Sequence, residues 1–507
     1  MSGGELNILR STPTTAISNQ GREFSFVLST TPENIEVTGG VINLHIPAGR
    51  NAYFTSQGPF FNLNIIKDAP SAFHAAVKAH PGRTDINEPV PSLPVHVLND
   101  LKLEDFAIFH TGDNNVDVYA GGDFIINPDA AYTPGVNTSF FNGEGPQLFD
   151  LSGTITAGLN NLSLTNTCDL NLAGGMVLTI RGNIEIEPNT VLRDNGRSIT
   201  IAGDIYNSGT HFKPAAGAGS IQLTGTLPQT ISGDGTGSFN NLTVNKSGGS
   251  VTMTSDMTIK GNLRLISNHR VAIGNNSLNL GPEGFVFSSL TGNDQQFNAN
   301  KMIVTNGLSS DGGINKTWSN TNEFLFPFGF KAQDDNFYYT PAFITFTQTP
   351  DTWGNVTVCP VSIRHPLAQG TLNSITVYWK TLSKGFTGIP GGSVTHKYFY
   401  DHAATDYFVQ GNEADYRPAF YNGGDTWVSI PDVNFVDQTI NQITFENRSF
   451  AQGEYTAGEP GAFEGIPVLY SRQDGGWDEA STWSETAVGG EESSFIPGPG
   501  TIVIIGD

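Results

Sequence analysis

The chain has 507 residues, of which 14% are charged, and its 48 acidic and 25 basic residues give a net charge of −23. No cluster of Lys and Arg interrupts this acidity, which argues against nucleic-acid binding and against attraction to an anionic membrane surface. The simplest interpretation is that acidity keeps a large exposed protein soluble, with cation binding or repulsion of anionic surfaces as the functional alternatives. The 59 Gly and 33 Phe indicate a turn-rich chain with ample core material, which argues against disorder.

The segment 1–40 contains strand candidates at 6–9 and 23–28, which we expect to start or cap the β structure. The segment Met1–Glu5 lacks the basic start and apolar run of a signal peptide, and no stretch is long enough to span a membrane. Since the chain stops in the strand-like run 501–507, we expect both ends to be cut from a longer protein.

The segment 41–315 carries an internal repeat. The segments 160–164, 181–186 and 198–205 recur in the same order at 240–244, 260–265 and 277–281, with a degenerate earlier copy at 57–65 and 122–126. Successive elements are spaced by one nearly constant period, which separates Gly182 from Gly203 and Gly261 from Gly281. A period of about 20 residues with short strands of alternating polarity predicts one coil of a right-handed parallel β-helix.

Glycine and asparagine recur at the corners of the predicted coils. Glycine is expected there for its access to positive φ, which asparagine also tolerates. Stacked asparagines are expected to form ladders along the solenoid, with Asn161 and Asn241 at one position and Asn183 and Asn262 at another.

The segment 68–94 interrupts the earliest copy of the repeat. The run Ser71–Ala79 is the most convincing helix in the sequence, because Pro70 precedes it and Pro81-Gly82 follows it. Two interpretations of this insertion stay open: a helix that carries binding, or one that covers an open solenoid edge.

From Trp318 the period stops, and aromatic strand candidates follow. They predict a β-sandwich over residues 316–460, with Trp379 as a core residue. A third piece, residues 461–507, contains Trp477 and Trp483 and is expected to begin a further β-helical module. The strand candidates of the sandwich are 323–326, 342–346, 355–358, 375–379, 396–400, 427–430 and 442–445.

Three motifs resemble those of large surface proteins of Bacteroidetes. They are Gln229-Thr-Ile-Ser-Gly with 239–244 and 261–263, the run 324–330 with 339–342, 377–379 and 399–401, and 469–477 with 482–484 and 497–504. The resemblance implies a cell-surface or extracellular location, export by the type IX secretion system and, in some members, adhesion in gliding motility. It transfers no catalytic residue, and the sorting domain that this route requires is not in the sequence.

The sequence contains no established catalytic or metal-binding motif, and we assign no catalytic, cofactor-binding or metal-ligating residue. Because β-helices also host polysaccharide lyases and hydrolases, carboxylate pairs are the alternative to consider. The candidates are Glu185 and Glu187 with Asp194, and Glu104-Asp105 near His110 and Asp113; a solvated face is favoured for both groups.

Other candidate ligands are weaker. Structural calcium stays open at 113–115 and 334–336, although turn formation is the simpler interpretation. A metal role for His396 and His402 is disfavoured, and Cys168 and Cys359 are expected to be buried thiols rather than a disulfide.

The sequence therefore predicts a non-enzymatic stalk or adhesive segment of a large bacterial surface protein. The expected partners are other domains of the same long chain, surface glycans or the export machinery. A carbohydrate-binding or polysaccharide-degrading β-helix protein is the alternative.

Overall fold

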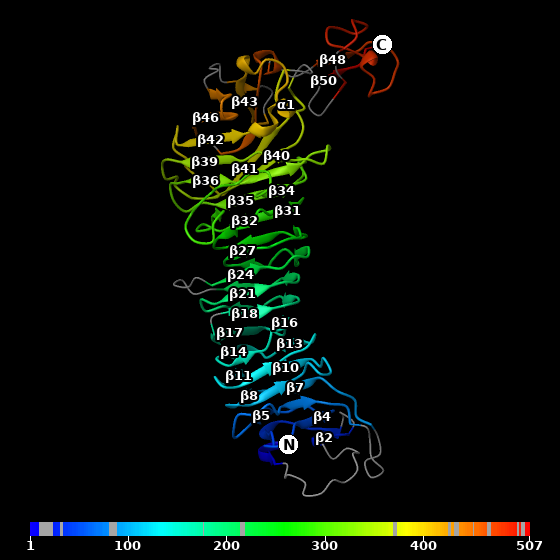
Figure 1. The fold of residues 1–507 in the computed structure, drawn as a ribbon. Helices are drawn as coiled ribbons and strands as arrows, with labels where there is room; N and C mark the ends of the chain where they lie inside the picture. The colour runs from blue at the N-terminus through cyan, green and yellow to red at the C-terminus, as the bar shows by residue number, and fades with distance from the viewer. Residues whose placement is uncertain are drawn as a thin grey trace. The chain divides into compact units, whose positions relative to one another are not determined.

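The computed structural model is nearly all β, and its main body is a β-solenoid of about 12 turns followed by further sheets (Figure 1). It describes residues 1–9, 24–30, 34–80, 89–175, 177–212, 219–368, 373–423, 427–429, 435–449, 451–463, 468–493, 496–497 and 502–506. The fold divides into two compact units, Met1–Ser255 and Asp256–Asp507.

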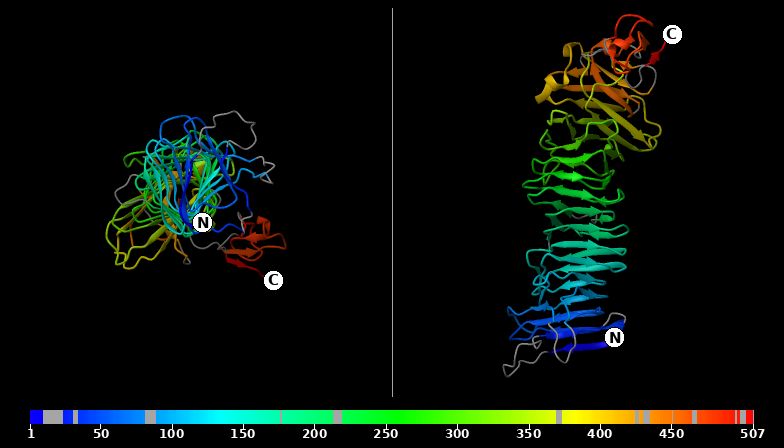
Figure 2. Two further views of the ribbon diagram at one scale, coloured as in Figure 1. Left: turned by 90° about the horizontal axis from the view of Figure 1, so that it is seen from below. Right: turned by 90° about the vertical axis from the view of Figure 1, so that its right-hand side faces the viewer.

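The first unit is a three-faced coil of parallel strands, whose successive coils are stacked in both side views (Figures 1 and 2). Its first face comprises β1 (Ser2–Ile8), β3 (Gly39–His45), β5 (Asn62–Ile66), β8 (Leu101–Leu103), β11 (Phe124–Ile126), β14 (Gly145–Leu151), β17 (Cys168–Gly174), β20 (Val191–Arg193), β23 (Thr210–Phe212) and β26 (Ser238–Phe239).

The other two faces are built in the same way. The second comprises β7 (Val95–Val97), β10 (Val118–Ala120), β13 (Thr138–Phe141), β16 (Asn161–Leu164), β19 (Ile184–Ile186), β22 (Ile205–Asn207), β25 (Gln229–Ser232) and β28 (Val251–Met253). The third begins with β2 (Phe24–Leu28), β4 (Ala52–Ser56), β6 (Ala75–Val77), β9 (Ile108–His110), β12 (Ala131–Thr133) and β15 (Thr154–Ile155), and resumes with β18 (Val177–Ile180), β21 (Ser198–Ile201), β24 (Ser220–Leu223) and β27 (Leu242–Val244).

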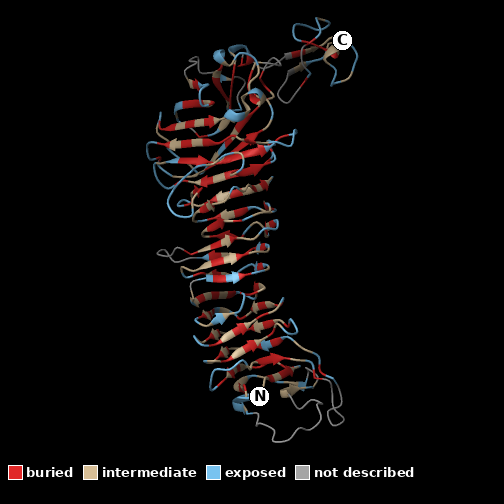
Figure 3. Ribbon diagram, viewed as in Figure 1, coloured by how far each residue is buried: buried red, intermediate tan, exposed pale blue. Residues whose placement is uncertain are grey.

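Alternating polarity directs one set of side chains into the core. In β19, Ile184 and Ile186 are buried while Glu185 between them is exposed, and the same alternation recurs along the coils (Figure 3). The strand register puts Ile184 beside Leu162 and beside Ile205, so one coil spans 162–183 and the next spans 184–204. The predicted parallel solenoid is confirmed, with coils slightly longer than the predicted period.

The sequence repeat does not coincide with whole coils. Asn161–Leu164 lies in β16 on the second face, whereas its sequence counterpart Leu242–Val244 is β27 on the third face. Each coil contributes three strands, and β27 is the eleventh strand after β16. The two segments are therefore three and two-thirds coils apart, which is not a whole number of coils. Equivalent residues of the two sequence blocks therefore occupy different faces.

The helix predicted for Ser71–Ala79 is wrong. Ala75–Val77 forms β6, which pairs in parallel with β4 and β9. Alanine locally favours helix, but pairing with two neighbouring strands and burial of all three β6 side chains outweigh that preference. The expected stop signal Pro81-Gly82 lies outside the described residues.

The repeat glycines have a different role from the predicted one. Gly182 and Gly203 do not adopt positive φ. A Cβ at Gly182 would lie 2.3 Å from Asn161 Oδ1, and one at Gly203 would lie 2.4 Å from Asn183 Oδ1. Glycine is required there because the asparagine side chain of the preceding coil occupies the space.

The second unit begins with solenoid strands and continues into antiparallel sheets. Parallel pairs join β29 to β32, β32 to β35, β30 to β33, β31 to β34 and β34 to β37. Parallel pairing therefore continues to Phe330, beyond the expected limit at 315. The bounds are β29 (Met257–Ile259), β30 (Leu263–Leu265), β31 (Val271–Gly274), β32 (Ser277–Leu280), β33 (Val286–Phe287), β34 (Ile303–Thr305), β35 (Gly313–Thr317) and β37 (Phe328–Lys331).

Two antiparallel sheets form the expected sandwich-like region. One contains β40 (Asn355–Val361), β41 (Tyr378–Lys384), β43 (Arg417–Tyr421), β44 (Val428–Ser429) and β47 (Gly453–Gly458); the other contains β36 (Glu323–Phe326), β39 (Ala342–Phe346), β42 (Val394–Phe399), β45 (Val436–Asp437) and β46 (Gln442–Arg448). Trp379 of β41 is fully buried and stacks on Tyr398 of β42 at 5.0 Å between ring centroids, which joins the two sheets and confirms Trp379 as a core residue.

The remaining elements are short. They are β38 (Phe337–Tyr339), β48 (Val468–Ser471), β49 (Trp483–Ser484), β50 (Ile502–Ile504), the helix α1 (Thr405–Phe408) and the 3-10 helices His402–Ala404, Glu413–Asp415, Pro460–Phe463 and Ala480–Thr482. β48 pairs in parallel with β50 and antiparallel with β49. No helix among the described residues is long and apolar enough to cross a membrane.

Candidate functional site

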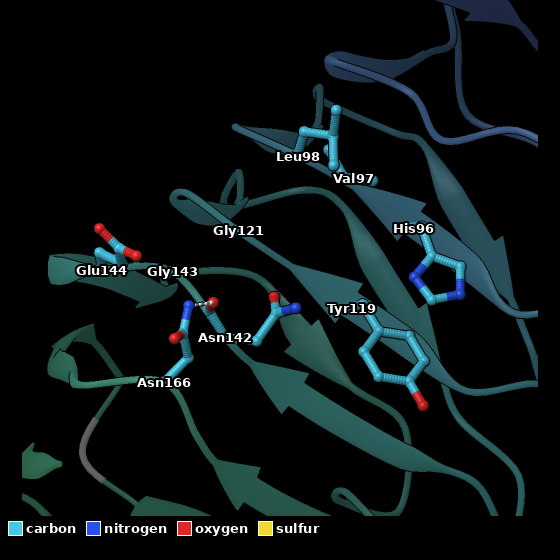
Figure 4. Close-up of a pocket in the computed structure, with 9 residues that line it drawn as sticks. All are labelled: His96, Val97, Leu98, Tyr119, Gly121, Asn142, Gly143, Glu144 and Asn166. Carbon is cyan, nitrogen blue, oxygen red and sulfur yellow. Dashed lines mark hydrogen bonds between the residues drawn. The ribbon is translucent and has the colours of Figure 1, made fainter. Parts of the chain in front are cut away.

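A column of stacked rings lies on the outward side of the second face. His96 of β7, Tyr119 of β10 and Phe140 of β13 are in register, and their ring centroids are 4.3 Å apart at each step. Figure 4 shows the first two of these rings, those of His96 and Tyr119. Burial lowers the pKa of His96 and raises the pKa of Tyr119. Both faces of the Tyr119 ring are covered by its neighbours, so that ring cannot stack on a sugar.

A small pocket of about 220 Å³ adjoins this column. Asn142 and Asn166 line it, and the side chain of Asn166 donates to the backbone carbonyl of Asn142 at 3.1 Å (Figure 4). The Oδ1 atom of Asn142 is buried without a hydrogen-bond partner among the described residues. The pocket can therefore accept a hydrogen bond, although it is smaller than the roughly 300–1,000 Å³ of typical ligand sites.

The pocket lacks the pair of carboxyl groups of a typical glycosidase site among its described lining residues. Glu144 is the one carboxylate among its described lining residues, whereas glycosidic cleavage commonly uses two carboxyl groups on either side of the scissile bond. This geometry gives no support for placing catalysis here.

The three acids singled out in the sequence do not form a site. Glu185 points outward from β19 and accepts a hydrogen bond from Ser163 Oγ at 3.1 Å. Asp194 is fully buried and lies 2.9 Å from Nε2 of His211, which is also fully buried. Glu187 follows the end of β19 and is only partly buried. The interpretation of Glu185 as a solvated outward residue is confirmed.

The second acidic group is rearranged by the fold. Glu104 forms an ion pair with Lys102 at 2.9 Å and accepts from Asn127, and Asp105 is exposed. His110 and Asp113 do come together, with 3.5 Å between Nδ1 and Oδ1. Their third neighbour is His74, and ligand atoms of His74, His110 and Asp113 lie within 4.8 Å of one another.

The loops kept open for calcium already use side-chain oxygens in hydrogen bonds within the protein. Asn115 Oδ1 accepts from the backbone of Val136 at 2.9 Å. Asp334 accepts from both nitrogens of Asn336 and from the hydroxyl of Tyr338, while Asp335 pairs with Lys331. The geometry favours turn formation at both loops.

The remaining candidates are separated. His396 is fully buried in β42, where its ring stacks on Tyr455, whereas His402 is exposed. Cys168 and Cys359 are free, and burial raises the pKa of each thiol to about 12. Neither cysteine has the electropositive, accessible surroundings of a reactive thiol.

The second unit carries a larger hollow, of about 650 Å³. Trp477 lines it with 58% of its surface exposed, together with Arg472, Gln473 and Asp474. Trp483 is buried against Trp477, with 5.0 Å between ring centroids, and donates to the backbone carbonyl of Trp477 at 3.1 Å. An exposed indole beside polar side chains can bind a ligand that has both apolar and hydroxylated faces.

Comparisons with known proteins add no assignment: no family model, no curated protein and no solved structure matches this chain.

The sequence pointed to some of these features and missed others. The sequence does not single out His74, because this residue lies in the predicted helix. The ring column could have been predicted from the sequence, because His96, Tyr119 and Phe140 follow one another at intervals close to the length of one coil. The vacant acceptor of Asn142 depends on tertiary contacts and has no counterpart in the sequence.

Proposed function

We propose that this chain is a non-enzymatic structural segment of a large bacterial surface protein, acting as a stalk that presents adhesive modules. The observation that carries the proposal is that outward polar side chains are bonded to the next coil. Asn161 Oδ1 accepts from the backbone of Asn183, and Asn183 Oδ1 accepts from the backbone of Asp204, both at 2.8 Å. Asp204 continues the series by accepting from the backbone of Thr230 at 2.7 Å.

A second series lies at the start of the solenoid. The amide of Asn64 donates to Asn43, and that of Asn43 donates to Asn7, each at 2.9 Å. Side chains used in this way stabilise the stack by linking each coil to its neighbour, since each satisfied bond contributes about 1 kcal/mol. Such a surface suits a rigid spacer, in which each stacked coil adds roughly 4.8 Å of length.

The surface location and the type IX export route rest on the resemblance of the repeat and of the tryptophan-containing third piece to Bacteroidetes surface proteins. Antibody labelling of intact source cells tests the location. We expect labelling without permeabilisation and loss of the signal after external protease treatment. A signal that needs permeabilised cells would contradict the proposed location.

A deletion of one whole coil tests the spacer role. Leu162 and Ile184 occupy equivalent positions on successive coils, so removal of residues 162–183 rejoins the chain in register. We expect this variant to fold and to retain surface attachment. Removal of 162–172 is the control, because it shifts the register by half a coil and should prevent folding.

Loss of attachment in the folded variant that lacks 162–183 would contradict a spacer role. Release of sugar products from a polysaccharide panel by the purified chain would contradict the non-enzymatic assignment, provided that Glu144→Gln or Glu185→Gln abolishes the release.

Carbohydrate binding is the second candidate function, favoured by the exposed Trp477 and the polar side chains around it. A glycan array with the purified chain tests it. We expect any bound glycan to be lost in Trp477→Ala and retained in Leu382→Ala, which removes a comparably exposed apolar side chain elsewhere. Equal binding by both variants would exclude the Trp477 hollow as the site.

A further inference from the structure

Two histidines from successive coils meet on the third face of the first unit. His74 directly precedes β6 and His110 is the last residue of β9, and these strands pair with Ala75 beside Phe109. Asp113 follows in the turn after β9. The parallel register thus brings together residues that are far apart in the sequence.

The three side chains bring ligand atoms within 4.8 Å of one another. The imidazole rings stack with centroids 4.2 Å apart and an interplanar angle of 22°. His74 Nε2 lies 3.9 Å from Asp113 Oδ2, and His110 Nδ1 lies 3.5 Å from Asp113 Oδ1. The contacts do not meet hydrogen-bond geometry, so the three groups lie near one another without satisfying one another.

Both facing nitrogens lack a partner. Among the described residues, His74 Nε2 and His110 Nδ1 are buried and accept or donate no hydrogen bond. A buried polar atom without a partner costs about 1–3 kcal/mol, so two of them aimed at one space call for an explanation. The ring of His74 also forms a hydrogen bond with the backbone of Ala72. Because Nε2 has no hydrogen-bond partner, Nδ1 makes this bond, and Nε2 is left as the ligand atom.

The charges around the cluster favour ligation. Burial lowers the pKa of His74, and the neighbouring His110 lowers it further, so His74 is neutral at pH 7. Lys67 acts in the same direction and opposes a cation, but its ammonium is held by the carbonyls of Ser71 and Phe73. Asp113 is 54% exposed and supplies a negative charge that is free to turn inward.

We propose that His74 Nε2, His110 Nδ1 and the carboxylate of Asp113 bind a divalent transition-metal ion of the zinc class, with water as the fourth ligand. Zinc–nitrogen bonds of about 2.0–2.1 Å need ligand atoms about 3.4 Å apart. The ligand atoms here lie within 4.8 Å of one another, so the widest separation must close by at most about 1.4 Å. Rotation of exposed Asp113 and a small opening of the stacked rings accomplish this. The ion would join two successive coils.

Calcium does not suit this site. Two of the three ligands are imidazole nitrogens, whereas calcium takes oxygen ligands, and the neighbouring amide oxygen of Asn115 is already bonded to Val136. The Asn114 amide donates to the carbonyl of Val77 at 2.8 Å, which fixes the turn that presents Asp113.

Titration of the chelator-treated full chain with Zn²⁺ tests the proposal. We expect one ion to bind per chain, with a visible Co²⁺ absorption spectrum typical of four-coordination. His74→Gln, His110→Gln and Asp113→Asn should each weaken Zn²⁺ binding by at least about tenfold, a loss that follows even from removing outer-shell partners. His402→Ala, which removes an exposed histidine from the other unit, should bind as the wild type does.

Thermal melting separates ligation from damage to the fold. In chelator, the variants should melt close to the wild type, and Zn²⁺ should raise the melting temperature of the wild type and of His402→Ala only. Absence of stoichiometric Zn²⁺ binding by the wild type would overturn the proposal. Equal affinity in wild type and in all three ligand variants would overturn it as well.

Discussion

The carboxylate of Asp194 lies 2.9 Å from Nε2 of His211, and neither side chain has any exposed surface. Asp194 also accepts from the backbone of Gly196 at 2.8 Å, so both carboxylate oxygens have partners. The pair joins β23 to the turn after β20 inside the solenoid. Because both side chains are fully buried, a substrate cannot reach them, and we interpret the pair as structural.

Asp194→Ala should destabilise the first unit by about 3–5 kcal/mol, because it leaves a buried imidazole without its partner. Chemical denaturation followed by circular dichroism measures the effect. Glu185→Ala is the control, since its exposed position predicts a change within about 0.5 kcal/mol. Equal effects of the two substitutions would contradict the assigned burial of Asp194.

Close approach of successive coils makes Gly143 irreplaceable. A Cβ at this position would lie 2.0 Å from the carbonyl oxygen of Gly121 in the preceding coil, so Gly143→Ala should cost about 3 kcal/mol or more. Gly49→Ala is the matched control, because nothing lies within 4 Å of its Cβ position. Its denaturation midpoint should be unchanged or slightly raised. A tolerated Gly143→Ala would mean that these coils are further apart.

The ring column should contribute stability through stacking. Tyr119→Leu keeps an apolar side chain but removes two ring contacts, which should cost about 1–2 kcal/mol. Tyr206→Leu provides the comparison, because Tyr206 is exposed on the same face and has no ring contact among the described residues. Denaturation midpoints of the two variants distinguish stacking from simple apolar burial.

The two cysteines should report separately on the two units. At pH 8 neither thiol should react with a chromogenic disulfide reagent, because both are buried and each pKa is raised to about 12. In Cys359→Ser, Cys168 should become reactive only when Met1–Ser255 unfolds; in Cys168→Ser, Cys359 should report on Asp256–Asp507. Rapid labelling of either native variant would contradict the assigned burial.

Stability without metal should depend on the protonation of His74. Above its ordinary pKa of about 6.5, this histidine is neutral in both folded and unfolded chains. Below that value the unfolded chain takes up a proton that the folded chain resists, so stability should fall as the pH drops. His74→Gln should show a shallower decline between pH 7 and 5 in chelator. An unchanged slope would show that His74 does not resist protonation.

Sequence patterns alone were enough to predict the parallel solenoid, the Trp379 core and most strands of the sandwich-like region. These follow from side-chain alternation and spacing, which are properties of neighbouring residues. The helix prediction at 71–79 was wrong because it also rested on the preferences of neighbouring residues. In the folded chain, pairing of this segment with β4 and β9 outweighs the local preference for helix.

Which side chains meet became visible only in the folded chain. Coil length sets the register, and register brought His74 to His110, buried Asp194 against His211, and placed the two copies of the sequence repeat on different faces. A shift of a few residues in the length of the coil that separates His74 from His110, or Asp194 from His211, would abolish that contact. Because that length is fixed by the stacking of whole coils, short-range sequence patterns could not reveal them.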